Sequence, residues 1–283
     1  MKIQRICIYK ADIPLIKPFR TALGQTSTAK NIFVKIETDS SLYGMGEGSP
    51  FTPVVGETQA SAFAIAADMG KRLLGSDPTD IEGAIRILKS FTLNCKTTLS
   101  AFDMALYDLL GKAAGLPLYA LLAGGKRTLF TDRTVGIDSA ENMAREAEFF
   151  KNLGVCAIKV KLGTTPREDI ERMTAIRKAI GNDLPVRIDA NQGWDRLSSI
   201  QALKEMKNLD IQYCEQPVAA WDYDSMAHIA SLSDIPIMAD ESLFDEHDAY
   251  RLMFKGSCDC LNIKLAKSGG IHTALKINSI AEA

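Results

Sequence analysis

The second half of the chain alternates short apolar segments with amphipathic ones, and this alternation constrains the fold more than any other feature. Six segments have strand-like patterns, near residues 132–137, 156–161, 185–189, 211–215, 236–240 and 259–264. Helical patterns follow them, near residues 139–153, 166–180, 196–207, 222–233, 245–254 and 270–282. Alternation of this kind predicts a parallel sheet, either closed as a TIM-type barrel or open and doubly wound. No Gly-x-Gly-x-x-Gly run follows a strand, which argues against a dinucleotide-binding fold.

The first 125 residues have a different pattern. Three strand-like segments predict an antiparallel meander, near residues 3–10, 31–38 and 42–48. Polar loops are expected at 19–30 and 49–56, and helices near 57–74, 79–90 and 97–114. An α+β unit before a series of β/α units favours the barrel. We therefore expect an α+β capping domain at residues 1–125 and a (β/α) barrel domain at residues 126–283, with about six of its units present.

The bulk properties exclude several classes of function. The formal net charge is −2 and no basic block occurs, so neither a nucleic acid nor a membrane surface is expected as a partner. The six cysteines are scattered without paired Cys-x-x-Cys motifs, which favours reduced thiols in a cytoplasmic protein over a zinc site. A small-molecule substrate is expected, and self-association into a homo-oligomer stays open.

Three carboxylates stand at the ends of consecutive predicted strands. Asp189, Glu215 and Asp240 are separated by about one β/α unit each. Any one of them could be an ordinary cap, but in a barrel the carboxyl ends of the strands converge on one mouth. Carboxylates packed together repel one another unless a cation neutralises them. An all-oxygen site of this kind suits Mg²⁺, with Mn²⁺ as the second choice.

Lysines lie in the predicted units before and after these carboxylates. Lys159 and Lys161 point to the same face of one strand, because strand side chains alternate. Two buried ammonium groups repel, so at least one is expected to have a lowered pKa, as a proton-transfer base requires. Lys264 ends the sixth predicted strand. The three histidines, His228, His247 and His272, fall in helical segments and are interpreted as surface or packing groups.

A divalent cation between two opposed lysines fits removal of a proton α to a carboxylate. The cation stabilises the two negative charges of the resulting enediolate. If one lysine removes the proton and the opposite one returns a proton to the other face, the product is an epimer. A single base acting with a leaving group would instead give elimination.

The order Lys-x-Lys, Asp, Glu, Asp, Lys resembles that of the enolase superfamily, muconate-lactonizing subgroup. Four longer runs most resemble the dipeptide epimerases: Asp-Ala-Asn-Gln-Gly-Trp from 189, Glu-Gln-Pro-Val from 215, Ala-Asp-Glu-Ser from 239 and Asn-Ile-Lys-Leu-Ala-Lys-Ser-Gly-Gly from 262. The resemblance implies an isomerase, a Mg²⁺-dependent dipeptide epimerase that transfers a proton at the α carbon of the C-terminal residue. The o-succinylbenzoate synthases and cycloisomerases share the pattern and are the alternative. A non-catalytic metal-binding fragment is the alternative from another class.

The resemblance also implies roles for single residues. It makes Asp189, Glu215 and Asp240 the Mg²⁺ ligands. Lys161 and Lys264 become the acid/base groups, and Lys159 neutralises the substrate carboxylate and helps lower the Lys161 pKa. Thr134 matches a first-strand threonine near the substrate. Glu241 is interpreted as a partner of a lysine in preference to a helix-start acid.

The resemblance sets expectations for specificity and for chain length. Relatives that act on Ala-Glu resemble one another in a loop arginine, where this chain has Gly24. We therefore expect an L-Ala-Xaa dipeptide with an apolar second residue, in a pocket lined by Phe19, Phe51 and Val54. A complete barrel has eight units, so we expect the natural chain to continue past Ala283 with the Asp-x-Asp segment that holds the substrate ammonium group in this family.

Overall fold

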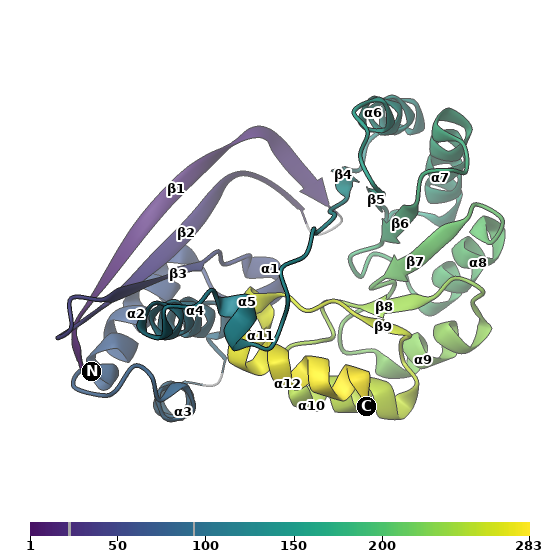
Figure 1. Cartoon of the computed structure of the whole chain (residues 1–283). Helices are drawn as coiled ribbons and strands as arrows, with labels where there is room; N and C mark the ends of the chain where they lie inside the picture. The colour runs from purple at the N-terminus through teal and green to yellow at the C-terminus, as the bar shows by residue number, and fades with distance from the viewer. Residues whose placement is uncertain (22–23, 93) are drawn as a thin grey trace.

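The computed structural model describes residues 1–21, 24–92 and 94–283, which form two units with separate hydrophobic cores (Figure 1). The N-terminal core is built from side chains such as Ile32, Val34 and Leu106, all fully buried. The second core is built from side chains such as Val160 and Ile188, which are also fully buried.

The N-terminal unit contains an antiparallel sheet in the order β1-β2-β3, so the predicted meander is confirmed. Its strands are β1 (Ile3–Thr21), β2 (Gly24–Thr38) and β3 (Tyr43–Gly48). The predicted polar loop at 19–30 is wrong, because Phe19 pairs with Thr26 and Thr21 with Gly24, which extends the hairpin. Of the side chains that the structure describes at 24–30, none is buried. The two strands are joined there by backbone hydrogen bonds, which leave no hydrophobic periodicity in the sequence from which the pairing could be predicted.

The helices of this unit are α1 (Thr52–Val55), α2 (Gln59–Leu73), α3 (Ile81–Phe91), α4 (Lys96–Ala114) and α5 (Leu118–Leu121). Helices α2 and α4 pack against the strands of the sheet. The one-turn helix α1 lies within the predicted loop at 49–56. Helix α4 packs closely against β3, where a Cβ on Gly46 would lie 1.9 Å from the carbonyl oxygen of Ala101. Glycine at this position therefore allows the helix to lie directly against the strand.

The second unit is a six-stranded parallel sheet in the order β4-β5-β6-β7-β8-β9, which is a partial barrel with helices outside it (Figure 1). The strands are β4 (Arg133–Val135), β5 (Ile158–Lys161), β6 (Val186–Asp189), β7 (Ile211–Glu215), β8 (Ile237–Ala239) and β9 (Cys260–Leu261). The helices are α6 (Ala140–Asn152), α7 (Pro166–Ile180), α8 (Arg196–Met206), α9 (Tyr223–Leu232), α10 (Glu246–Lys255), α11 (Leu265–Ser268) and α12 (Ile271–Glu282). The alternation is confirmed, but β9 ends three residues before Lys264.

Side-chain caps fix where five of these helices begin. The side chains of Ser139, Thr165, Asp195, Asp222 and Asp245 each accept a hydrogen bond from a backbone N–H in the first turn. Such caps satisfy donors that the helix itself leaves free. Each of these caps anchors the end of the loop that leads from a strand into the helix.

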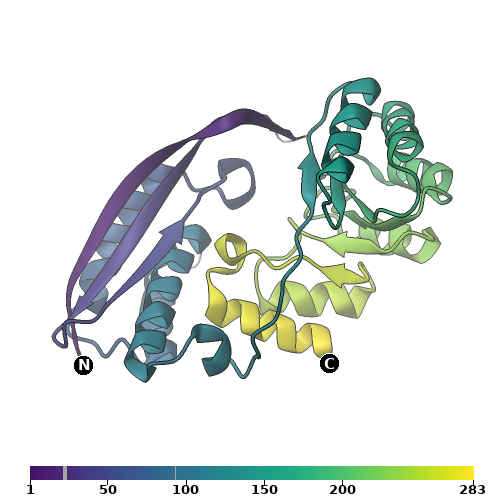
Figure 2. The ribbon, with the colours of Figure 1, turned by 45° about the horizontal axis from the view of Figure 1, so that its top comes forward.

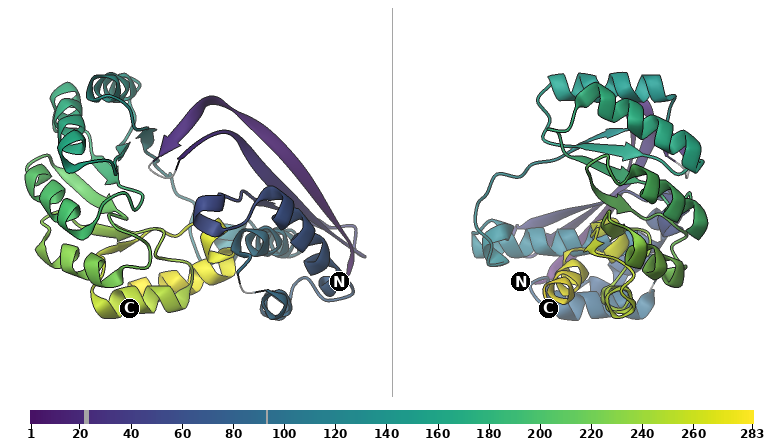
Figure 3. Two further views of the ribbon diagram at one scale, coloured as in Figure 1. Left: turned by 180° about the vertical axis from the view of Figure 1, so that it is seen from behind. Right: turned by 90° about the vertical axis from the view of Figure 1, so that its right-hand side faces the viewer.

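The N-terminal unit approaches the parallel sheet of the second unit in two places, near its first strand β4 and near the helices that follow its last strand β9. A connecting segment runs from α5 to β4 (Figure 2). The far ends of β1 and β2 extend toward β4, whereas α11 and α12 lie beside α4 (Figure 3). Among the described helices, none combines the length and the apolar character needed to cross a bilayer.

Candidate active site

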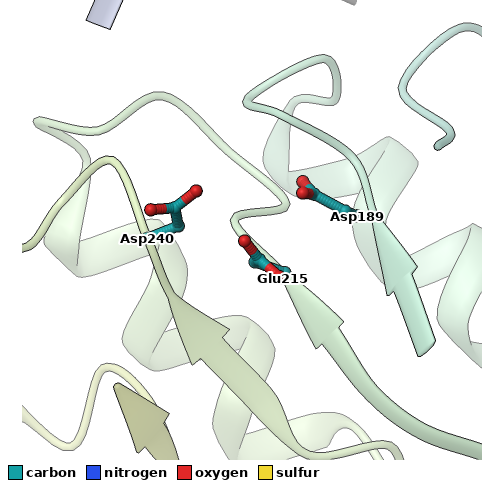
Figure 4. Close-up of side chains that lie close together, drawn as sticks. All are labelled: Asp189, Glu215 and Asp240. Atoms are coloured by element: carbon teal, nitrogen blue, oxygen red, sulfur yellow. The ribbon is translucent and has the colours of Figure 1, made fainter. Parts of the chain in front are cut away.

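Three buried carboxylates converge at the carboxyl ends of β6, β7 and β8 (Figure 4). Asp189 and Glu215 are the last residues of their strands and Asp240 directly follows β8. Their exposed fractions are 0%, 1% and 1%. One oxygen from each lies within 4.8 Å of the others, a spacing that can hold a metal ion. The predicted convergence is confirmed, because parallel pairing places Asp189 opposite Glu215.

The two lysines of β5 approach this cluster from one side. Lys159 Nζ lies 2.9 Å from Asp189 Oδ2 and 2.5 Å from Glu215 Oε2. Lys161 Nζ lies 2.7 Å from Asp189 Oδ2. The shared face of the two lysines is thus confirmed. Burial lowers the Lys159 pKa, but the neighbouring Asp189 and Glu215 carboxylates outweigh burial and hold that pKa above its ordinary value, so Lys159 is not the lysine with the lowered pKa.

Two lysines reach the cluster from the other side, beyond β9. Lys264 Nζ forms an ion pair with Asp240 Oδ2 and lies 4.0 Å from Glu215 Oε1. Lys267 Nζ lies 2.5 Å from Asp240 Oδ1 and also donates to the backbone carbonyl of Asp240. Lys267 was not among the residues predicted for the site. Its spacing of three residues after Lys264 was the available signal, because residues three apart share one side of a helical turn.

The pKa values of the carboxylates reflect a balance between burial and the lysines. Burial, followed by the Asp189 charge, raises the pKa of Glu215 to about 7. Burial also raises the pKa of Asp189, but Lys161 and Lys159 outweigh it and leave that pKa below the ordinary value. Asp240 follows the same rule, because its two lysines more than offset its burial. The cluster therefore needs positive charge, which the lysines supply in this structure.

Amide side chains complete the cluster and were missed by the sequence analysis. Asn191 Oδ1 accepts from Lys161 Nζ at 2.8 Å, and Asn191 Nδ2 donates to Glu241 Oε1 at 3.0 Å. Asn262 Nδ2 donates to Glu215 Oε1 at 2.8 Å. Glu241 thus reaches Lys161 only through an amide. The signal was the position of both asparagines within two residues of a predicted site residue.

Of the remaining predicted residues, the structure places Thr134 beside this centre and Gly24 and Phe51 at a cavity of the N-terminal unit. Thr134 on β4 is paired in register with Lys159, which places it at the edge of the site. Gly24 and Phe51 line one cavity of 510 Å³ between the end of the hairpin and the 49–53 segment. Val54 lies in α1 and does not line that cavity. The side chain of Phe19 lies outside the part of the chain that the structure describes.

The histidines lie in helices and not at the strand ends that carry the carboxylates. The three histidines lie in α9, α10 and α12, as expected. All six cysteines are free thiols.

The carboxylate triad has lysines on both sides. This arrangement can bind a cation, neutralise an anionic substrate and move protons on two faces.

An antiparallel capping sheet joined to a partial barrel, with acidic ligands at the strand ends, defines an enolase-type protein. The Mandelate racemase / muconate lactonizing enzyme N-terminal domain matches residues 4–123, and the Enolase C-terminal domain-like family matches residues 142–283. The chain belongs to the mandelate racemase and muconate lactonizing enzyme group of the enolase superfamily.

Individual relatives narrow the class further. The chain is 41% identical to the L-Ala-D/L-Glu epimerase of Clostridium acetobutylicum, over 100% of this chain and 80% of that protein. It is 40% identical to the hydrophobic dipeptide epimerase of Enterococcus faecalis, with the same coverage. The crystal structure of the dipeptide epimerase from Cytophaga hutchinsonii, complexed with Mg and D-Ala-L-Val, superposes with a TM-score of 0.98 at 41% identity, covering 100% of this chain and 77% of that one. The chain is an enzyme of the epimerase and racemase branch of this superfamily.

Proposed function

We propose that this protein is a Mg²⁺-dependent dipeptide epimerase that inverts the α carbon of the C-terminal residue by two-base 1,1-proton transfer. The observation that carries the proposal is the placement of Lys161 and Lys264 on opposite sides of one buried carboxylate triad. Relatives named as dipeptide epimerases, at about 40% identity over the whole chain, support the same reaction.

The carboxylate triad fits a hard divalent cation. Three buried oxygens within 4.8 Å of one another, from Asp189, Glu215 and Asp240, are the ligand type that Mg²⁺ prefers, with Mn²⁺ as a second choice. Burial, and after it the charge of Asp189, raises the pKa of Glu215, and a cation bound among the carboxylates would oppose both effects. Bound there, Mg²⁺ supplies positive charge that offsets the negative charge developing on the substrate carboxylate.

The three lysines are assigned proton transfer and neutralisation of the substrate carboxylate. We assign proton removal and return on one face of the α carbon to Lys161, and on the opposite face to Lys264. Lys159, which already pairs with two carboxylates, supplies a fixed ammonium charge for the substrate carboxylate. Stabilising charge at the position where it develops is among the largest contributions to catalysis.

We further propose that residues 1–125 act as a capping domain that selects the substrate, over a catalytic barrel domain at residues 126–283. Gly24 brings no charge to the 510 Å³ cavity, and Phe51 brings an apolar ring that is 39% exposed. Both features favour an L-Ala-Xaa dipeptide with an apolar second residue. Lys30 also lines the cavity, so dipeptides with an acidic second residue are the contrasting case to test.

Deuterium exchange tests the reaction and the specificity together. Purified protein with Mg²⁺ in D₂O is mixed with separate pools of apolar, acidic and basic L-Ala-L-Xaa dipeptides, and mass spectrometry detects a one-unit mass gain. Deuterium in the apolar pool supports the whole proposal. A gain confined to the acidic pool keeps the reaction and overturns the specificity. Exchange in no pool overturns the dipeptide assignment, and o-succinylbenzoate synthase or cycloisomerase substrates then become the next to assay.

We also propose a cytoplasmic location. All six cysteines are free thiols, as expected of a protein kept in a reducing compartment. Thiol titration of the freshly isolated native protein tests this, because six reactive thiols after denaturation support it and disulfide-linked cysteines contradict it.

A further inference from the structure

We propose that Glu241 and Asn191 form a positioning pair for Lys161. The pair orients the lysine that acts on one face of the substrate and makes no contact with Lys264, which acts on the other face. This inference rests on the two-base function proposed above and adds a division of the site into two differently supported halves.

The direction of proton transfer at Lys161 depends on its hydrogen-bond acceptors. Lys161 Nζ has Asp189 Oδ2 at 2.7 Å and Asn191 Oδ1 at 2.8 Å. A neutral lysine amine has two N–H donors and one lone pair in a fixed tetrahedral arrangement. When both donors are taken, the lone pair can only point in the remaining direction. In the ammonium form, the third proton points the same way. Asn191 therefore helps to determine where Lys161 collects and delivers its proton.

Glu241 determines which end of the Asn191 amide faces Lys161. Asn191 Nδ2 donates to Glu241 Oε1 at 3.0 Å, so the amide oxygen is turned to the lysine. The reversed amide would place an NH₂ group against an ammonium group and an oxygen against a carboxylate, and both contacts are repulsive. Asn191 and Glu241 are only 6% and 3% exposed, so water does not easily replace either contact.

The backbone of Asn191 is held as firmly as its side chain. Its φ of 44° lies in the left-handed region, which asparagine tolerates better than most residues. Its N–H donates to Asp189 Oδ1 at 2.9 Å. The same aspartate thus anchors the loop and accepts from Lys161, so the lysine, the amide and the loop form one connected arrangement.

Lys264 has different support. Its Nζ pairs with Asp240 Oδ2 and lies 4.0 Å from Glu215 Oε1. Among the contacts of residues 1–21, 24–92 and 94–283, none joins Lys264 to Asn191 or Glu241. In the same part of the chain, Glu241 Oε2 is buried without a hydrogen-bond partner. Among the described residues, the bond to Asn191 is therefore the side-chain hydrogen bond of Glu241, and its carboxylate otherwise acts on Asp240 and Lys267 only through its charge.

Face-resolved exchange separates this role from a merely structural one. Each of the two epimers of one accepted dipeptide is incubated separately in D₂O with Mg²⁺, and α-deuterium incorporation is followed at early times. Lys161→Ala and Lys264→Ala identify which epimer each lysine deprotonates. Glu241→Leu removes the acceptor for Asn191. Glu241→Gln keeps an acceptor oxygen and serves as the matched control.

We expect Glu241→Leu to slow exchange of the Lys161-dependent epimer by about 10-fold or more, as misplacement of a reacting group does. Exchange of the Lys264-dependent epimer should stay within about twofold of wild type, the limit we set for an unaffected face. Glu241→Gln should restore most of the loss. Asn191→Gly, which tolerates the positive φ, should show the same one-sided loss and decides the matter if Glu241→Leu does not fold.

Two results overturn the inference while leaving the proposed function intact. One is an equal loss for both epimers in Glu241→Leu or Asn191→Gly, which shows a general structural role. The other is undiminished exchange of the Lys161-dependent epimer. If the wild-type protein exchanges neither epimer of any dipeptide, the proposed function itself fails, and this inference fails with it.

Discussion

The carboxylate of Asp103 on α4 accepts a hydrogen bond from the backbone N–H of Ile271, the first residue of α12, at 2.5 Å. It also accepts from the next backbone N–H, that of His272, at 3.2 Å. Helix α12 begins after Gly270 and has no side-chain cap of its own. A residue of the N-terminal unit therefore supplies the cap for a helix of the barrel.

Asp103 is expected to make stability depend on pH. Burial raises its pKa from 3.8 to about 7, with the two backbone N–H groups opposing the shift. Between these pH values the folded state binds a proton more tightly than the unfolded state, so stability falls as the pH rises. Asp103→Asn keeps an acceptor oxygen without the charge. We expect its stability relative to wild type to increase from pH 5 to pH 8 in urea unfolding. A difference independent of pH would contradict the shift.

Loss of either acid/base lysine is expected to stop epimerisation and to leave proton exchange on one face only. Lys161→Ala and Lys264→Ala should each abolish epimerisation, because each removes the proton donor or acceptor on one face. Each variant should still exchange the α-proton of one epimer, and the retained epimer should differ between them. Polarimetry and mass spectrometry measure the two properties. Full epimerase activity in Lys264→Ala would rule out the two-base assignment.

The carboxylate triad is expected to couple Mg²⁺ to stability. Binding to the folded state alone stabilises by about 3 kcal/mol when the free ion is at about 100 times its Kd. Thermal unfolding should therefore move to higher temperature on adding MgCl₂ and return on adding EDTA. Glu215→Gln should remove most of this response, whereas Glu171→Gln, at an exposed carboxylate on α7, should keep it. An equal response in both variants would place the cation elsewhere.

Lys267 is expected to matter most when no cation is bound. Its Nζ is buried and pairs with Asp240, so Lys267→Met leaves a buried carboxylate with less compensation. Loss of one partner of a buried ion pair costs roughly 3–5 kcal/mol. We expect a loss of this order in urea unfolding with EDTA and a smaller loss with Mg²⁺. The exposed Lys178→Met on α7 is the control. Equal losses with and without Mg²⁺ would separate Lys267 from the cation site.

Gly193 is expected to tolerate no side chain. A Cβ at this position would lie 2.2 Å from the carbonyl oxygen of Gly163, where the loops after β6 and β5 cross. Gly193→Ala should therefore cost about 1–3 kcal/mol through overpacking and shift the loop that carries Asn191. Gly125→Ala, which meets no atom within 4 Å, should be near neutral. Chemical denaturation and the exchange assay measure both effects. A neutral Gly193→Ala would show that the loops separate easily.

Residues whose environment is set by a periodic pattern could be predicted from the sequence. The alternation of strands and helices placed Asp189, Glu215 and Asp240 at successive strand ends. Because parallel strands end at one edge, their convergence followed from order alone. The shared face of Lys159 and Lys161 followed from strand alternation. Local patterns in the sequence thus determined which residues enter the site. They also determined that the site is an acidic cluster facing lysines.

Only the tertiary structure decided how those groups are supported. The pairing of Phe19 with Thr26 extends a polar hairpin that no hydrophobic period marks. The contacts of Lys267 with Asp240, of Asn191 with Lys161 and of Asp103 with α12 join elements that are distant in the chain. The raised pKa of Lys159 depends on which carboxylates lie beside it once the strands are packed. Hydrogen bonds and charge balance act over a few ångströms in space, so they are determined only when the fold brings these residues together.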